Sequence, residues 1–256
     1  MKTIIAIATT LAVLTNAHGA DLSQRIATPS GIVIHLPAGW QQIPKDIMTA
    51  QFAEAAKQNP NLPKQTYEYG FQAPSGQWFS YPYLLVQIQR TGRIPEVALK
   101  KMPILDEMMG SKMDETVEAA SAVADAAMGK TVYDSANRIL WTSARMNYAG
   151  IGNIKMLAGG HLSEDGFVQV FGYAKEEDFA RYEALLHDII TSVRLPDGMR
   201  FVPRATDNSL LFHAIDWDKA LSKGIAGAVL GGLAALIIGL TRRKKKTPNQ
   251  TMEGTK

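Results

Sequence analysis

Short apolar runs in the first half of the chain predict strands separated by one helix. Residues 31–36 (GIVIHL) are β-branched and are followed by a turn sequence. Residues 66–72 (TYEYGFQ) and 78–90 (WFSYPYLLVQIQR) are rich in aromatic and β-branched residues, which favours two more strands. Pro82 interrupts the second of these and favours an edge strand or a bulge. A helix is predicted between the first two strands, over residues 46–58.

The second half of the chain predicts helices followed by a meander. The segments 96–109 and 112–128 have helical composition, and the second is rich in alanine and acidic residues. Four closely spaced strands then follow, at Thr131–Asp134, Arg138–Tyr148, Ile154–Leu162 and Gly166–Tyr173. Residues 175–191 carry apolar side chains at three- and four-residue spacing, which predicts an amphipathic helix. The pattern therefore predicts an α+β domain with an antiparallel sheet.

The most apolar run lies near the C-terminus. Gly224–Leu240 holds seventeen uncharged residues, which form a helix of about 25 Å and come close to the thickness of a bilayer core. Extension back through residues 220–223 makes up the shortfall. A basic cluster follows at once, formed by Arg242, Arg243, Lys244, Lys245 and Lys246. The positive-inside rule predicts that this cluster stays in the cytoplasm and that the preceding domain lies outside it.

The N-terminus has the composition of a signal peptide. Lys2 supplies a positive charge, residues 4–14 are apolar, and residues 17–19 are small or polar, as at a cleavage site. An uncleaved anchor is the alternative. We therefore expect a signal peptide (1–19), an exported domain (28–203), a connector (204–223) with a juxtamembrane helix over Leu210–Leu221 that includes Trp217, a transmembrane helix (224–240) and a basic tail (241–256).

Charge and composition narrow the function classes. The formal net charge is +3, but seven of the 27 basic residues and one of the 24 acidic residues lie outside residues 21–223, which leaves the exported part at −3. An acidic domain disfavours nucleic-acid binding. The chain has no cysteine, so neither a disulfide framework nor thiolate chemistry is expected.

Three features of the sequence resemble the PsbP/Mog1-like family over about residues 28–196. The first strand leads into a Pro-x-Gly-Trp turn, formed here by Pro37, Gly39 and Trp40, the middle of the region is rich in strands, and the last helix is followed by Ser192 and Val193. The resemblance implies an α/β/α sandwich, in which an antiparallel sheet carries helices on both faces. It supplies no catalytic residues, and the chain lacks the lipobox cysteine of the lipoprotein members.

Candidate catalytic and metal-binding residues do not form a recognisable motif. Four histidines remain after the signal (His35, His161, His187 and His213), and none has a second ligand at metal-binding spacing. Met102, Met108, Met109 and Met113 suit Cu(I), but their spacing also fits a buried helical stripe. We therefore expect no catalytic site, no cofactor and no metal.

The apolar run itself carries the most specific pattern. Gly227, Gly231, Ala235 and Gly239 recur every four residues along one helix face. Small residues at this spacing allow two helix backbones to approach closely in lipid. We expect this face to contact a second copy of the chain or another membrane subunit.

Together these patterns predict a non-enzymatic, single-pass envelope protein of the cytoplasmic membrane. Its main domain would lie in the periplasm or outside the cell and act through interaction or assembly with a protein partner. The alternative is a solute- or metal-binding domain, or an enzyme whose site forms only in the folded protein.

Overall fold

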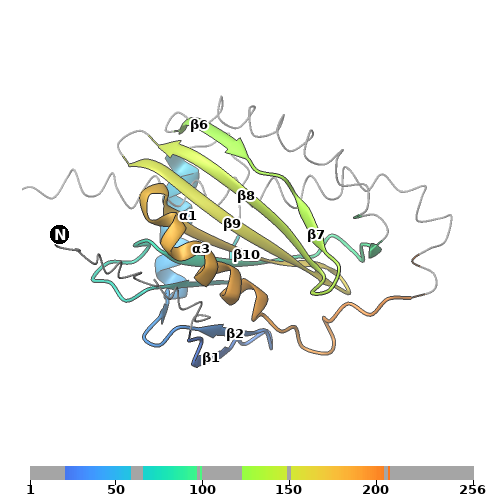
Figure 1. Ribbon diagram of the computed structural model, residues 1–256. Helices are drawn as coiled ribbons and strands as arrows, with labels where there is room; N and C mark the ends of the chain where they lie inside the picture. The colour runs from blue at the N-terminus through green and yellow to red at the C-terminus, as the bar shows by residue number, and fades with distance from the viewer. Residues whose placement is uncertain are drawn as a thin grey trace, which may run out of the picture.

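The computed structural model describes residues 21–58, 66–96, 99, 123–148, 151–204 and 207, and it has a mixed α+β fold (Figure 1). A two-stranded antiparallel sheet pairs β1 (Gln24–Ala27) with β2 (Val33–Leu36). The larger sheet has eight strands in the order β3-β4-β5-β10-β9-β8-β6, with β7 also paired to β8. Its strands are β3 (Gln41–Gln42), β4 (Tyr69–Gln72), β5 (Tyr83–Gln89), β6 (Val123–Met128), β7 (Val132–Asp134), β8 (Ile139–Tyr148), β9 (Gly152–Ser163) and β10 (Gly166–Lys175).

The hairpin of β9 and β10 forms the centre of the larger sheet. Its register pairs Ser163 with Gly166 beside the turn and Ile154 with Lys175 at the far end. Gly166 at the turn has φ of +131°. A side chain there would meet the carbonyl oxygen of Gln89 at 2.1 Å, so only glycine fits this turn. The hairpin thus has two distinct ends, and we call the end with the Glu164–Asp165 turn the hairpin end.

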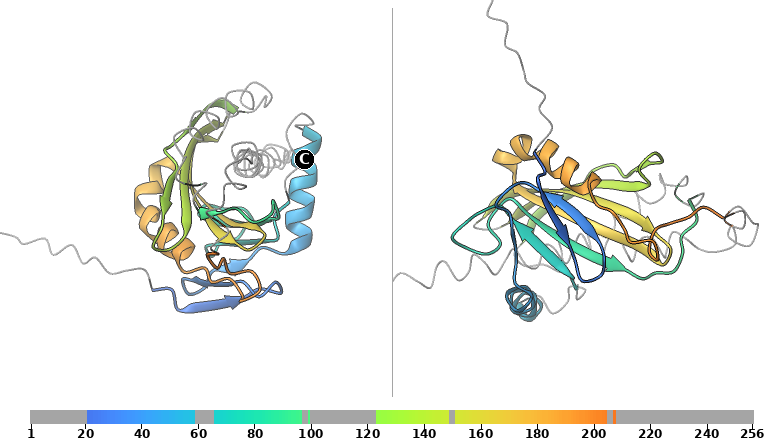
Figure 2. Two further views of the ribbon diagram at one scale, coloured as in Figure 1. Left: turned by 90° about the vertical axis from the view of Figure 1, so that its right-hand side faces the viewer. Right: turned by 90° about the horizontal axis from the view of Figure 1, so that it is seen from below.

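Helix α3 (Glu176–Thr191) packs along the convex face of the sheet (Figure 2). Its buried side chains join those of β10 and β2 in one apolar cluster. Two glycines of the sheet allow this close packing, because a Cβ at Gly159 would lie 2.4 Å from Ile190 and one at Gly172 would lie 2.8 Å from Leu186. The amphipathic helix predicted from the apolar spacing is confirmed.

Helix α1 (Lys45–Gln58) lies on the opposite, concave side of the sheet (Figure 2). Met48 and Ala55 are buried there together with residues of β5, β8, β9 and β10. Met48 also contacts Gly70 of β4, where a Cβ would lie 2.8 Å from its sulfur atom. The predicted α+β class with antiparallel sheets is therefore confirmed, and the described helices pack on different faces.

The residues that carry the family resemblance hold the convex side together. Gly39 has φ of +82°, which turns the chain so that Trp40 is buried in the cluster beneath α3. The hydroxyl of Ser192 accepts a hydrogen bond from the amide of His35 at 3.0 Å. Arg194 forms a β-bridge with Val33 of β2. These residues act in turns and strand ends.

Two sequence predictions are wrong. The helix predicted over residues 112–128 is wrong in its C-terminal part, because Val123–Met128 is a strand that pairs with β8. Alanine favours helices, but the free edge of β8 supplies backbone hydrogen bonds that override this preference. A strand within residues 78–90 is confirmed, but it begins only at Tyr83, and it lies between β4 and β10, so the edge position inferred from Pro82 is wrong. Pro82 precedes the strand and so removes no hydrogen bond from it.

The predicted membrane-spanning segment, residues 224–240, lies outside the described residues. Among the residues that the structure describes, no helix is long and apolar enough to cross a membrane.

Candidate functional site

The residues predicted to act in the membrane all fall outside the described part of the chain. These are the contact-face residues Gly227, Gly231, Ala235 and Gly239 and the basic residues Arg242, Arg243, Lys244, Lys245 and Lys246. Met102, Met108, Met109 and Met113 lie outside it as well. Their predicted roles remain predictions.

The three histidines within the described residues have separate environments. His161 on β9 is buried, and its Nε2 lies 3.0 Å from the carbonyl oxygen of Ile190 on α3. Burial lowers the pKa of His161 to about 4, so its ring is neutral near pH 7. His187 is exposed on α3 and stacks on Trp141, with ring centroids 4.5 Å apart. His35 lies between Ile34 and Leu36 on β2 and therefore faces away from their core.

No group of three or more histidine, aspartate or glutamate side chains suited to a metal ion occurs in the described ranges. The histidines therefore do not converge there, and His161 is already bonded to a backbone carbonyl. The polar and titratable side chains that do gather are the tyrosines of the concave face and the ion pairs around Arg93.

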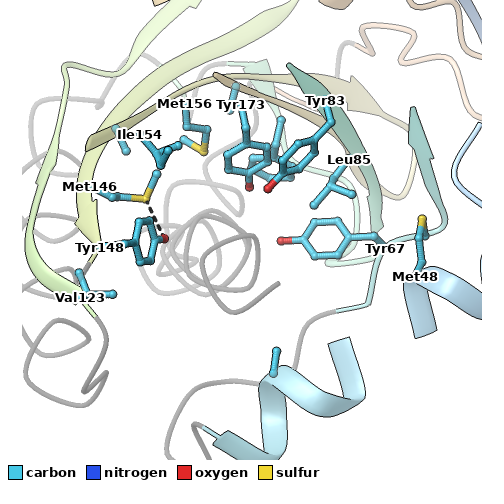
Figure 3. Packing of buried hydrophobic residues seen from close by; sticks show 14 of the residues in the cluster. Met48, Tyr67, Tyr83, Leu85, Val123, Met146, Tyr148, Ile154, Met156 and Tyr173 are labelled. Atoms are coloured by element: carbon cyan, nitrogen blue, oxygen red, sulfur yellow. Dashed lines mark hydrogen bonds between the residues drawn. The ribbon is translucent and has the colours of Figure 1, made fainter. Parts of the chain in front are cut away.

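Tyrosines line the concave face of the sheet. Tyr83 and Tyr173 lie side by side on β5 and β10 and stack with centroids 5.0 Å apart. Tyr67 packs on Phe52 of α1 at 4.8 Å. Figure 3 shows the hydroxyls of Tyr67, Tyr83, Tyr148 and Tyr173 pointing toward the same region of the concave side. Burial raises the pKa of all four tyrosines, so these hydroxyls stay neutral and can donate as well as accept hydrogen bonds.

Several buried polar atoms on this face have no hydrogen-bond partner among the residues that the structure describes. They include the Tyr83 hydroxyl, Oε1 of Gln169 and Oγ1 of Thr142. Gln169 shares the side-chain direction of Phe171 and Tyr173 on β10. A buried polar atom left unpaired costs about 1–3 kcal/mol, so each of these atoms lowers the stability of the domain.

A second group of residues forms an ion-pair cluster centred on Arg93. Its guanidinium donates to Asp207 from Nε at 3.0 Å and from Nη2 at 2.7 Å, and it also pairs with Glu164. Arg204 forms a further ion pair with Glu164. The side chains of Arg93 and Asp207 are only 12% and 8% exposed, so solvent screens this pair weakly.

The cluster fastens the chain after α3 to the hairpin end. We call residues 196–204 and 207 the strap. Phe201 of the strap is buried beneath Arg93, whose Cζ lies 4.2 Å above the ring. The amide of Val202 donates to Glu164 at 2.8 Å and its carbonyl accepts from Arg93 at 2.5 Å.

The pKa shifts of the cluster follow from these bonds. The hydrogen bond from the Val202 amide, together with Arg93, lowers the pKa of Glu164. The hydrogen bonds from Arg93 lower the pKa of Asp207, and the same bonds raise the pKa of Arg93. Glu164, Asp207 and Arg93 are therefore all charged near neutral pH. The two carboxylates are balanced by Arg93 and Arg204.

A shallow pocket of about 160 Å³ lies at the same end of the domain. It is lined by residues of β5, of the hairpin and of the strap: Ile88, Gln89, Arg90, Ser163, Asp165, Gly198 and Met199. Sites for small molecules usually enclose about 300–1,000 Å³. This pocket is therefore a poor candidate for a ligand site.

Sequence reasoning missed both groups. Arg93 lies 71 residues before Glu164 and 114 residues before Asp207. Glu164 and Asp207 are themselves 43 residues apart, so no local pattern links the three. The tyrosines left a weak signal, because four of them fall within residues 67–83. Only the pairing of β5 with β10 adds Tyr173 to that set.

The chain was compared with family models, curated proteins and solved structures, and only the solved structures gave a match. No family model and no curated protein matches the chain. The structure is similar to the solution structure of cyanobacterial PsbP from Synechocystis, with a TM-score of 0.40 and 11% sequence identity, over 68% of this chain and 92% of that one. The PsbP-like resemblance expected from the sequence is thus found again in the structure, and it concerns the fold alone.

Proposed function

We propose that this protein is a non-enzymatic, single-pass envelope protein that holds an α/β/α sandwich domain at the outer face of the cytoplasmic membrane. The observation that carries the proposal is the uncharged run Gly224–Leu240, directly followed by five basic residues. Such a run suits a bilayer core, and the basic cluster suits its cytoplasmic side. The domain would act by assembly with a protein partner, in part through the small-residue face of the span.

The described domain supports a binding role over a catalytic one. Catalytic groups usually have shifted pKa values and face a cleft. Here the groups with shifted pKa values have structural partners or positions: His161 is bonded to α3, Arg93 holds the strap, and the tyrosines pack in the concave cluster. His161 and Arg93 are thus already bonded within the fold, and the tyrosines contribute to its packing.

Extraction of membranes at alkaline pH tests the anchor. We expect the full-length chain to stay with the membrane pellet. Replacing Leu233 and Leu236 by arginine places two charges at the centre of the span, at a cost of roughly 3 kcal/mol each for insertion. This double variant should be released, whereas the matched control Leu233→Ile should remain in the pellet. Release of the unmodified chain would contradict the proposal.

A second candidate function is the binding of a small uncharged solute on the concave face. The unpaired Tyr83 hydroxyl and Oε1 of Gln169 favour it, because neutral groups of this kind recognise neutral polar ligands. Native mass spectrometry of full-length protein taken from membranes tests it. A co-purifying small molecule that is lost from Tyr83→Phe would support solute binding, and an unliganded mass would oppose it.

A further inference from the structure

The strap joins the domain to the chain that leads into the proposed membrane span, and its bonds fix where that chain leaves the domain. The hairpin end holds the strap through backbone bonds as well as charges. Glu164 donates its amide to the carbonyl of Met199 at 3.0 Å, and Ser163 forms a β-bridge with Arg200. The last contact in the described chain is Asp207, which Arg93 holds by two hydrogen bonds.

Little chain separates this contact from the predicted juxtamembrane helix, residues 210–221. Three residue steps join Asp207 to Leu210, and an extended chain spans at most about 3.5 Å per residue. Asp207 therefore lies within about 10 Å of the start of that helix. A helix with Trp217 on it suits the membrane interface, so the fixed end of the strap is brought close to the lipid headgroups.

The opposite end of the domain is far from this point. Strand β10 runs from Gly166 at the hairpin end to Lys175, and ten residues of strand span about 33 Å. Glu177 at the start of α3 follows directly at that distant end, where its side chain is exposed. Figure 1 shows the chain after α3 returning toward the turn between β9 and β10.

From this geometry, which rests on the proposed membrane anchor, we propose that the hairpin end of the domain lies against the membrane surface in one fixed orientation. Val202, 54% exposed, is the apolar side chain at the contact. The charges nearby balance, because Arg90 pairs with Asp165, Arg200 with Asp197, and Arg204, which is 58% exposed, with Glu164. Contact with the headgroups of uncharged or zwitterionic lipids is therefore sufficient, and anionic lipid is not required.

Depth-dependent fluorescence quenching tests the orientation in the full-length chain. The chain has no cysteine, so Val202→Cys and Glu177→Cys each accept a single fluorophore. The proteins are reconstituted in phosphatidylcholine vesicles that contain a phosphatidylcholine with a nitroxide on its headgroup. We expect the label at position 202 to lose most of its emission and the label at position 177 to keep nearly all of it. Equal quenching at both positions would overturn the fixed orientation.

A variant that releases the strap gives a second test of the orientation. Asp207→Ala removes the last contact but leaves Arg93 paired with Glu164, so the fold is retained. We expect quenching at position 202 to fall and quenching at position 177 to rise. The matched control is Asp197→Ala, because this strap carboxylate is 90% exposed and forms its ion pair with Arg200, not with Arg93. If Asp207→Ala behaves like the control, the strap does not set the orientation.

Flotation of the same vesicles separates the two proposals. Labelled protein that fails to float with the vesicles shows that the membrane anchor itself is wrong. Protein that floats but is quenched equally at both positions shows that the anchor holds and that the orientation is wrong.

Discussion

Single buried polar side chains in this domain differ in how well their environment satisfies them. His161 has a backbone partner on α3 and a pKa lowered to about 4. The Tyr83 hydroxyl has no hydrogen-bond partner within the described part of the chain. Arg93 is fully engaged with two carboxylates and a carbonyl. Each residue therefore responds differently to substitution and to pH.

His161 makes the stability of the domain depend on acid. Its pKa is about 4 in the folded protein and about 6.5 when unfolded, so between these values the unfolded chain binds a proton that the folded chain does not. Stability therefore falls as the pH drops from 6.5 to 4, by up to about 3 kcal/mol. Urea denaturation at several pH values measures this slope. His161→Gln should flatten it, and an unchanged slope would contradict the assignment.

Removal of the Tyr83 hydroxyl should not weaken the fold. Tyr83→Phe deletes an unpaired buried polar atom and is expected to raise the free energy of unfolding by about 1 kcal/mol. Tyr69→Phe is the matched control, because the Tyr69 hydroxyl accepts a hydrogen bond from the amide of Ser30 at 3.2 Å. That variant should lose about 1 kcal/mol. A marked loss of stability in Tyr83→Phe would instead indicate a bound partner at the hydroxyl.

At the scale of elements, close packing of α3 on the sheet depends on glycines of β9 and β10. Gly159→Ala would place a methyl group 2.4 Å from Ile190, and overpacking of this kind costs about 1–3 kcal/mol. Gly76→Ala is the control, because a methyl group there meets nothing within 4 Å. Denaturation midpoints compare the two, and equal midpoints would show that α3 shifts without cost.

The sequence predicted the elements with strong periodicity and failed where distant contacts decide. The apolar stripe of α3 and the strand that begins at Gly166 are local signals, and both were predicted correctly. Val123–Met128 was predicted as helix because its alanines favour one, whereas its pairing with β8 depends on residues about twenty positions away. The Arg93 cluster joins residues 114 positions apart, which no local pattern records.

Association through the proposed span is a separate prediction at this scale. Gly231→Ile combined with Ala235→Ile fills the small-residue face, so we expect resonance energy transfer between two labelled copies of the span to fall to background. Leu233→Ile lies on another face and should leave the transfer unchanged. Undiminished transfer in the double variant would rule out this contact face.

The whole molecule, as proposed, places a folded domain on one side of a membrane and a basic tail on the other. The strap makes the connection short and specific, because Arg93 holds Asp207 and Phe201 is buried beneath it. A domain held in this way presents the start of α3 and the far end of β10 away from the lipid. These surfaces would then be the ones available to a partner outside the cytoplasm.

Topology of the full-length chain is the most direct test of this account. Because the chain lacks cysteine, Glu177→Cys reports on the domain and Thr251→Cys reports on the tail. A membrane-impermeant maleimide is applied to spheroplasts before and after permeabilisation. The account predicts that position 177 is labelled in intact spheroplasts and that position 251 is labelled only after permeabilisation. Labelling of both positions in intact spheroplasts, or of neither, would contradict it.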